Sequence, residues 1–171
     1  MAGACRAGAA PVTVLIELET TIAAPIERVF DLARDIDFHQ RSMVHTGERA
    51  IGGRMSGQLG LGETVTWQAR HLGRTWSLTS RITSFEAPTR FVDEQVDGPF
   101  AWFRHEHRFE SIDGGTWMTD TWQHVAPFGP IGRVADLLVL GRLLRHLLET
   151  RNEVLVREAE AGPSPDVGLS R

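Results

Sequence analysis

Two alternating segments joined by Asp113-Gly114 constrain the fold of this chain more than any other feature. Residues 101–112 and 115–125 flank this dipeptide, and Asp-Gly between alternating segments is a strong signal for a two-residue type I′ turn. A two-residue turn fixes the register of the hairpin. The predicted cross-strand pairs on one face are Phe109–Met118, His107–Asp120, His105–Trp122 and Phe103–His124. Half of the eight side chains on this face are apolar, and the other half are three histidines and one aspartate.

The opposite face of this hairpin is predicted to face solvent. It carries the charged series Arg104, Glu106, Arg108 and Glu110. A second hairpin is predicted from residues 63–71 and 74–86 around Leu72-Gly73, with the pairs Trp67–Leu78 and Ala69–Trp76. Aromatic and aliphatic side chains on one face and polar side chains on the other are typical of an antiparallel sheet covered on one side.

The remaining segments complete an α+β fold. Residues 12–22 and 89–96 alternate as strands, residues 24–33 and 35–43 have helical spacing, and a glycine-rich stretch has room for a strand near residues 48–51. Residues 130–158 are predicted to form a long helix with a wide apolar stripe, which consists of Val134, Leu137, Leu138, Leu140, Leu144, Leu147 and Leu148. We therefore predict a curved antiparallel sheet of six or seven strands wrapped around a long C-terminal helix, with two short helices after the first strand.

Composition limits the class of protein. At 171 residues the chain fits one domain, predicted at residues 12–158, and the leader (1–11) and the tail (159–171) are predicted to be disordered. The net charge of −4 gives no argument for nucleic-acid binding, and the absence of lysine excludes Schiff-base chemistry. Cys5 is the only cysteine, which favours a cytoplasmic location. No segment is long and apolar enough for stable membrane insertion.

Short motifs along residues 12–158 together resemble the START-like superfamily, also called SRPBCC, whose fold is the helix-grip. The matching pieces are Ala24-Pro25 followed by Val29-Phe30-Asp31, Gly62-Glu63-Thr64-Val65-Thr66-Trp67, Gly98-Pro99-Phe100 with Phe103, His105, His107 and Phe109, Gly114-Gly115-Thr116 with Met118 and Asp120, Pro127-Phe128-Gly129 and Arg151. The resemblance implies a cavity between helix and sheet for lipids, polyketides, quinones or hormones. Some members are aromatic polyketide cyclases and others only bind or carry, and no residue here matches a particular cyclase's catalytic residue.

The predicted ligand site lies between the sheet and the C-terminal helix. Its side chains are Trp67, Trp76, Phe91, Phe103, His105, His107, Asp120, Trp122, His124 and Leu144. The main prediction is that this site binds a small hydrophobic molecule. Two alternatives stay open: an enzyme of the polyketide cyclase or dehydratase type, and a module that binds a protein partner. A homodimer is compatible with the apolar helix.

The inward pair of His107 and Asp120 has four interpretations. The pair satisfies itself and fixes the register, or it orients a polar group of a ligand. His105, His107 and Asp120 are also the candidates for general acid–base catalysis. A metal site of the same three residues is the least favoured, because histidines two residues apart on a strand are far apart for one ion unless the strand bends. We assign no metal and no cofactor from the sequence.

Overall fold

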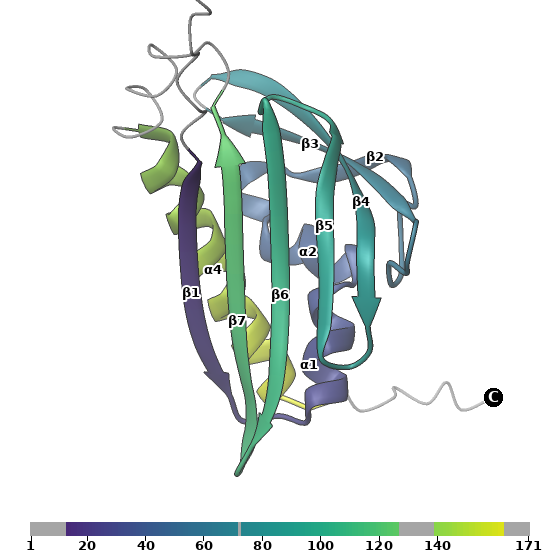
Figure 1. Ribbon diagram of the computed structural model, residues 1–171, viewed down its shortest axis with the longest axis vertical. Coiled ribbons are helices and arrows are strands. Elements are labelled where there is room, and N and C mark those ends of the chain that lie inside the picture. The colour runs from purple at the N-terminus through teal and green to yellow at the C-terminus, as the bar shows by residue number, and fades with distance from the viewer. Residues whose placement is uncertain (1–12, 72, 127–138, 163–171) are drawn as a thin grey trace, which may run out of the picture.

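The computed structural model describes residues 13–71, 73–126 and 139–162, and its main feature is one antiparallel sheet of seven strands. The strands are β1 (Val14–Ile22), β2 (Arg49–Gly53), β3 (Thr64–His71), β4 (Arg74–Glu86), β5 (Arg90–Asp97), β6 (Trp102–Ile112) and β7 (Gly115–Val125). Their order in the sheet is β1-β7-β6-β5-β4-β3-β2. Helix α4 lies behind β1 and β7 in Figure 1, on the same side of the sheet as α1 and α2. The predicted α+β fold is confirmed.

Both predicted hairpins have the predicted register. In β6–β7, Phe109 pairs with Met118, His107 with Asp120, His105 with Trp122 and Phe103 with His124. Gly114 in the turn has φ +81°, a left-handed conformation that favours glycine. In β3–β4, Trp67 pairs with Leu78 and Ala69 with Trp76. The alternation of each strand therefore assigned the inward and outward faces correctly.

Two short helices follow β1 and pack on the same side of the sheet as α4 (Figure 1). Helix α1 (Ile26–Ala33) begins after Pro25, whose ψ of 145° places it outside the helix. Helix α2 (Ile36–Ser42) is capped by the Asp35 carboxylate, which accepts a hydrogen bond of 2.7 Å from the Phe38 amide. A single 3₁₀ turn, η1 (Val44–Thr46), then leads into β2.

Helix α4 (Gly141–Glu160) covers the concave face and contacts β1, α1 and α2. Its buried residues recur every three or four positions: Leu148, Arg151, Asn152, Leu155 and Ala159. The helix ends two residues beyond the predicted domain boundary at 158. Residues 130–138 of the predicted helix, with Val134, Leu137 and Leu138, lie outside the described residues.

The interior contains two apolar clusters. The main cluster packs α1 and α2 against the sheet and the C-terminal half of α4, and it includes Phe30, Phe38, Phe91, Phe109, Met118 and Leu155. The second cluster consists of Ile16, Phe103, Trp122 and Leu148, under the N-terminal half of α4. Leu18, Leu78, Phe100 and Leu144 are only partly buried against this second cluster.

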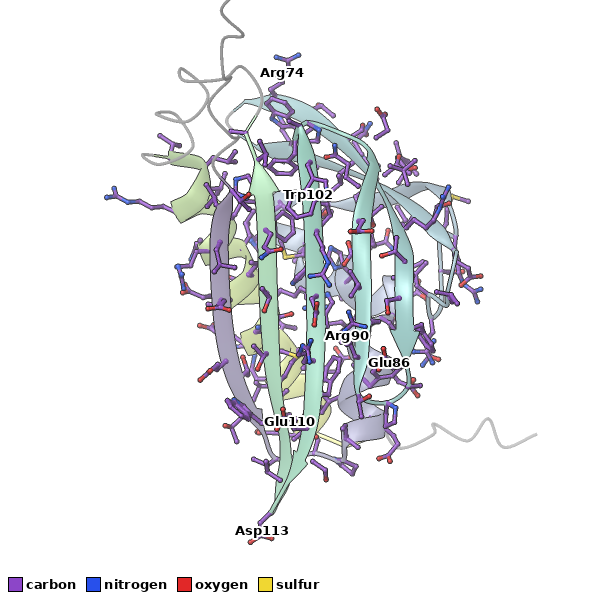
Figure 2. The ribbon with its side chains drawn as sticks, in the orientation of Figure 1. Arg74, Glu86, Arg90, Trp102, Glu110 and Asp113 are labelled. Carbon is purple, nitrogen blue, oxygen red and sulfur yellow. The ribbon has the colours of Figure 1, made fainter. Side chains whose placement is uncertain are left out.

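Glu106 departs from the prediction that its face of the hairpin is open to solvent. Its side chain is only 8% exposed, because the guanidinium groups of Arg90, Arg104 and Arg108 cover it. Arg90 Nε donates to Glu106 Oε1 over 3.1 Å, and Arg104 and Arg108 donate as well. Figure 2 labels Arg90 on the face of the sheet opposite α4. The outer face therefore has a shielded carboxylate, whose pKa these arginines lower from 4.5 to about 2 against the opposing effect of burial.

Candidate functional site

A buried cluster of two histidines and two aspartates lies between the apolar clusters. We call Asp93, His105, His107 and Asp120 the His–Asp cluster. Along β6 the two histidines lie between Phe103 of the second apolar cluster and Phe109 of the main one, so the polar residues interrupt the apolar interior. Asp120 is opposite His107, and Asp93 on β5 is opposite His105.

Each imidazole presents one nitrogen to each carboxylate. On one side, His107 Nδ1 lies 2.6 Å and His105 Nε2 lies 3.2 Å from Asp120 Oδ1. On the other side, His107 Nε2 lies 3.6 Å and His105 Nδ1 lies 3.8 Å from Asp93 Oδ1. The two carboxylates thus lie on opposite sides of a pair of imidazole rings.

The two rings lean together although they are two residues apart on one strand. Their centroids are 3.9 Å apart. Phe91 stacks on His107 with centroids 4.2 Å apart, and Trp122 lies 5.2 Å from the His105 ring. These flanking aromatic rings limit the positions open to the imidazoles. The expectation that the histidines lie far apart is therefore wrong.

Helix α4 contributes two polar side chains to the same region. Asn152 Nδ2 donates to Asp120 Oδ2 over 2.6 Å. Arg151 donates to the carbonyl oxygen of Ala33 over 2.7 Å, which ties α4 to the end of α1. Asp120 is therefore held by the helix through Oδ2, while its Oδ1 faces the two histidines.

Opposing effects set the charges of the two imidazoles. Burial and the neighbouring His107 lower the pKa of His105, and Asp120 only partly offsets this. Burial also acts to lower the pKa of His107, but the Asp120 carboxylate outweighs it, so the pKa of His107 is raised. Because the two rings are adjacent, a positive charge on one imidazole disfavours protonation of the other. The imidazole of His107 is therefore the better proton acceptor.

Both carboxylates stay ionised in the interior. Burial acts to raise the pKa of Asp120, but His107 and His105 hold it well below its ordinary value. The pKa of Asp93 is also lowered, because contact with the two histidines outweighs burial.

The predicted ligand residues divide between different surroundings. Phe103 and Trp122 belong to the second apolar cluster, with Leu144 partly buried beside them. His124 is buried and accepts a hydrogen bond of 3.0 Å from Trp122 Nε1. Trp67 and Phe91 belong to the main cluster. Trp76 is 38% exposed, and the Arg74 guanidinium lies 4.9 Å from its ring centroid.

A surface groove of about 310 Å³ lies between β1 and α4. It is lined by Leu18, Glu19, Thr20, Glu149, Asn152, Glu153 and Val156. None of the ten predicted ligand residues lines this groove. The predicted ligand pocket on the concave face therefore stays a prediction.

Sequence reasoning missed three polar residues around the cluster. Asp93, Asn152 and Arg151 were not among the predicted site residues, although Arg151 was noted in the motif comparison. A single aspartate after Phe91 and Val92 in a strand has no motif of its own. The sequence did offer one signal for Asp93. This residue is charged at a position where the alternation of its predicted strand calls for an apolar side chain, and that strand directly precedes the one with the histidines.

The fold and the arrangement of its layers define a class of protein. An open, curved antiparallel sheet that carries a C-terminal helix on its concave face is the helix-grip architecture. The sequence model of the family described as polyketide cyclase / dehydrase and lipid transport matches residues 13–160. The chain belongs to this family, as the motif resemblance implied. No curated protein matches the chain.

Solved structures support the same fold. TTHA0849 from Thermus thermophilus has a TM-score of 0.71 and 18% identity, covering 88% of this chain and 100% of that one. The di-domain ARO/CYC StfQ from the steffimycin biosynthetic pathway has a TM-score of 0.70 and 12% identity, covering 87% of this chain and 51% of that one. Ara h 8.0201 has a TM-score of 0.58 and 12% identity, covering 85% of this chain and 99% of that one. At these identities the likeness concerns the fold.

Among the described residues, no helix is long and apolar enough to cross a membrane.

Proposed function

We propose that this chain binds a small hydrophobic molecule, of the lipid, polyketide or quinone kind, between the sheet and the N-terminal half of α4. The observation that carries the proposal is the second apolar cluster. Its core of Phe103, Trp122, Ile16 and Leu148 is flanked by side chains that are only partly buried. Apolar side chains that the rest of the protein covers only partly can contact an apolar ligand.

The neighbouring His–Asp cluster supports an amphipathic ligand. The His105 ring contacts Trp122 on one side and lies in the polar cluster on the other. A ligand whose apolar body lies against Trp122 would therefore place a polar end near His105. The family description, which joins polyketide chemistry with lipid transport, is consistent with this class of ligand.

Replacing Trp122 with alanine tests the proposal. Trp122 is 9% exposed on the inner face of β7, whereas Trp117 on the same strand is 36% exposed on the outer face. We expect Trp122→Ala to weaken binding of anilinonaphthalene sulfonate, a fluorescent apolar anion, by about tenfold or more, because aromatic contact area is lost. The matched Trp117→Ala variant should bind as the wild type does.

Native mass spectrometry of untagged protein should in addition detect co-purifying apolar molecules. Circular dichroism of the variants establishes that both are folded, and Trp122→Phe, which keeps an aromatic ring, should retain most of the affinity. Equal weakening in the Trp117 and Trp122 variants, or no saturable binding by the wild type, would rule out the proposed pocket.

Catalysis on a polyketide is the second candidate function. It is favoured by one observation: the His105 ring lies at the boundary between the apolar cluster and the carboxylates. We expect His105→Phe to abolish conversion of a linear poly-β-ketone, measured as product formed per bound molecule by liquid chromatography and mass spectrometry. Unchanged conversion in this variant would exclude an acid–base role for His105.

A further inference from the structure

We propose that Asp93, His105 and His107 form a binding site for one divalent transition-metal ion, best matched by Zn²⁺. The proposal goes beyond the proposed function and does not depend on it. Each of the three residues offers one ligand atom, and these three atoms all lie within 4.8 Å of one another. The nitrogens nearest to Asp93 Oδ1 are His105 Nδ1 and His107 Nε2. Two imidazole nitrogens and one carboxylate oxygen are ligands that zinc accepts in proteins.

The distances from Asp93 to the two histidines are close to those between neighbouring ligands of a tetrahedral ion. Asp93 Oδ1 lies 3.6 Å from His107 Nε2 and 3.8 Å from His105 Nδ1. Bonds of about 2.0–2.2 Å to a tetrahedral zinc separate adjacent ligand atoms by about 3.3 Å. Small movements of side chains would therefore close the site around one ion. Three protein ligands leave the fourth position for water or another molecule.

The opposite nitrogens of the same two rings face Asp120. His107 Nδ1 and His105 Nε2 lie 2.6 and 3.2 Å from Asp120 Oδ1. These three atoms are buried, and among the described residues none has a partner with hydrogen-bond geometry. Metal-ligating histidines usually donate their second ring N–H to a carboxylate, which fixes the tautomer. Asp120 Oδ1 lies close enough to both ring nitrogens to take this role once small rotations of the rings direct their N–H groups at it.

Two further side chains hold these groups in place. Asn152 Nδ2 holds Asp120 Oδ2 from α4, so that Oδ1 remains directed at the histidines. Phe91 stacks on His107 and restrains the ring. The cluster therefore contains ligands, an orienting carboxylate and groups that hold that carboxylate in place.

Charge and access are also compatible with a cation. Two carboxylates lie next to the two imidazoles, and a dication with two neutral imidazoles would balance the charge of two ionised carboxylates. The Asp93 side chain is 17% exposed, whereas the Asp120 side chain is 0% exposed. The proposed ion position is therefore on the side of the rings that is nearer to solvent, as metal exchange requires.

Zinc binding to the untagged full chain tests the proposal. The protein is stripped with a chelator, dialysed and titrated with Zn²⁺ by calorimetry, in a Cys5→Ser background that removes the only thiol. We expect one Zn²⁺ per chain. Asp93→Asn should weaken the affinity by about 100-fold or more, since the loss of even an outer partner typically costs about 10–100-fold. The matched Asp97→Asn variant changes an exposed aspartate on the same strand and should bind normally.

Two further measurements test the site even if the Asp93 variant does not fold. Both use the Cys5→Ser protein, in which all three ligand side chains are intact. Cobalt(II), used in place of zinc, should give the visible absorption of a four-coordinate ion. Nitrogen-15 spectra of the histidines should show metal-induced shifts at His105 Nδ1 and His107 Nε2. Absence of stoichiometric Zn²⁺ binding, or equal affinity in the Asp93 and Asp97 variants, would overturn the proposal.

Discussion

Asp120→Asn is expected to lower the free energy of unfolding by about 3–5 kcal/mol, the typical cost of removing one partner from a buried ion pair. Asp120 is fully buried, faces both imidazoles through Oδ1 and accepts from Asn152 through Oδ2. Asparagine keeps the shape of the side chain but removes its charge. The buried His107 then loses the carboxylate that stabilises its protonated form.

Urea denaturation at neutral pH measures this loss. The chelator stays in the buffer, so the result reports on the metal-free cluster and is independent of the proposed zinc site. Asp97→Asn makes the same chemical change at an exposed position of β5 and should alter the free energy of unfolding by less than about 0.5 kcal/mol. If the two variants are equally stable, the cluster contributes little to the fold.

Glu106→Gln is expected to remove stability that depends on pH. The folded-state pKa of Glu106 is about 2, below its ordinary value of 4.5, because three arginines hold the carboxylate in its charged form. A pKa that is depressed on folding stabilises the protein above about pH 4.5, and this contribution is lost as the pH falls toward 2. The difference corresponds to roughly 3 kcal/mol at neutral pH.

The measurement is the free energy of unfolding of both proteins between about pH 7 and pH 3. The gap between wild type and variant should be constant down to about pH 5 and should narrow below it. Acid effects of Asp93 and Asp120 occur in both proteins and cancel in the comparison. Glu94→Gln serves as the control, because that outer-face carboxylate is 36% exposed and lies 3.9 Å from Arg104. If the difference in free energy of unfolding between wild type and Glu106→Gln stays constant down to pH 3, the pH-dependent stability does not come from Glu106.

The local signals of the sequence were strong for β6 and β7. The turn at Asp113-Gly114 fixed the pairing of His107 with Asp120, because a two-residue loop allows one register. The helical and strand periods then predicted which side chains face α4. The cytoplasmic location and the homodimer stay predictions.

Glu106 illustrates a limit of alternation. Its outward direction was predicted correctly, but its low exposure was not. Arg90 reaches it from β5, and the register of β5 against β6 depends on the whole sheet. Burial on an outer face is decided by the lengths and directions of neighbouring side chains, which alternation does not specify.

The sequence by itself determined the secondary structure, the hairpin registers and the inward direction of His105, His107 and Asp120, because these depend on neighbouring residues and short turns. Only the tertiary structure brought Asp93 and Asn152 to them. Asp93 comes from a strand joined to β6 by a longer connection with no fixed register, and Asn152 depends on how α4 is rotated over the sheet. Such long-range placements are set by packing of the complete chain, so no local pattern encodes them.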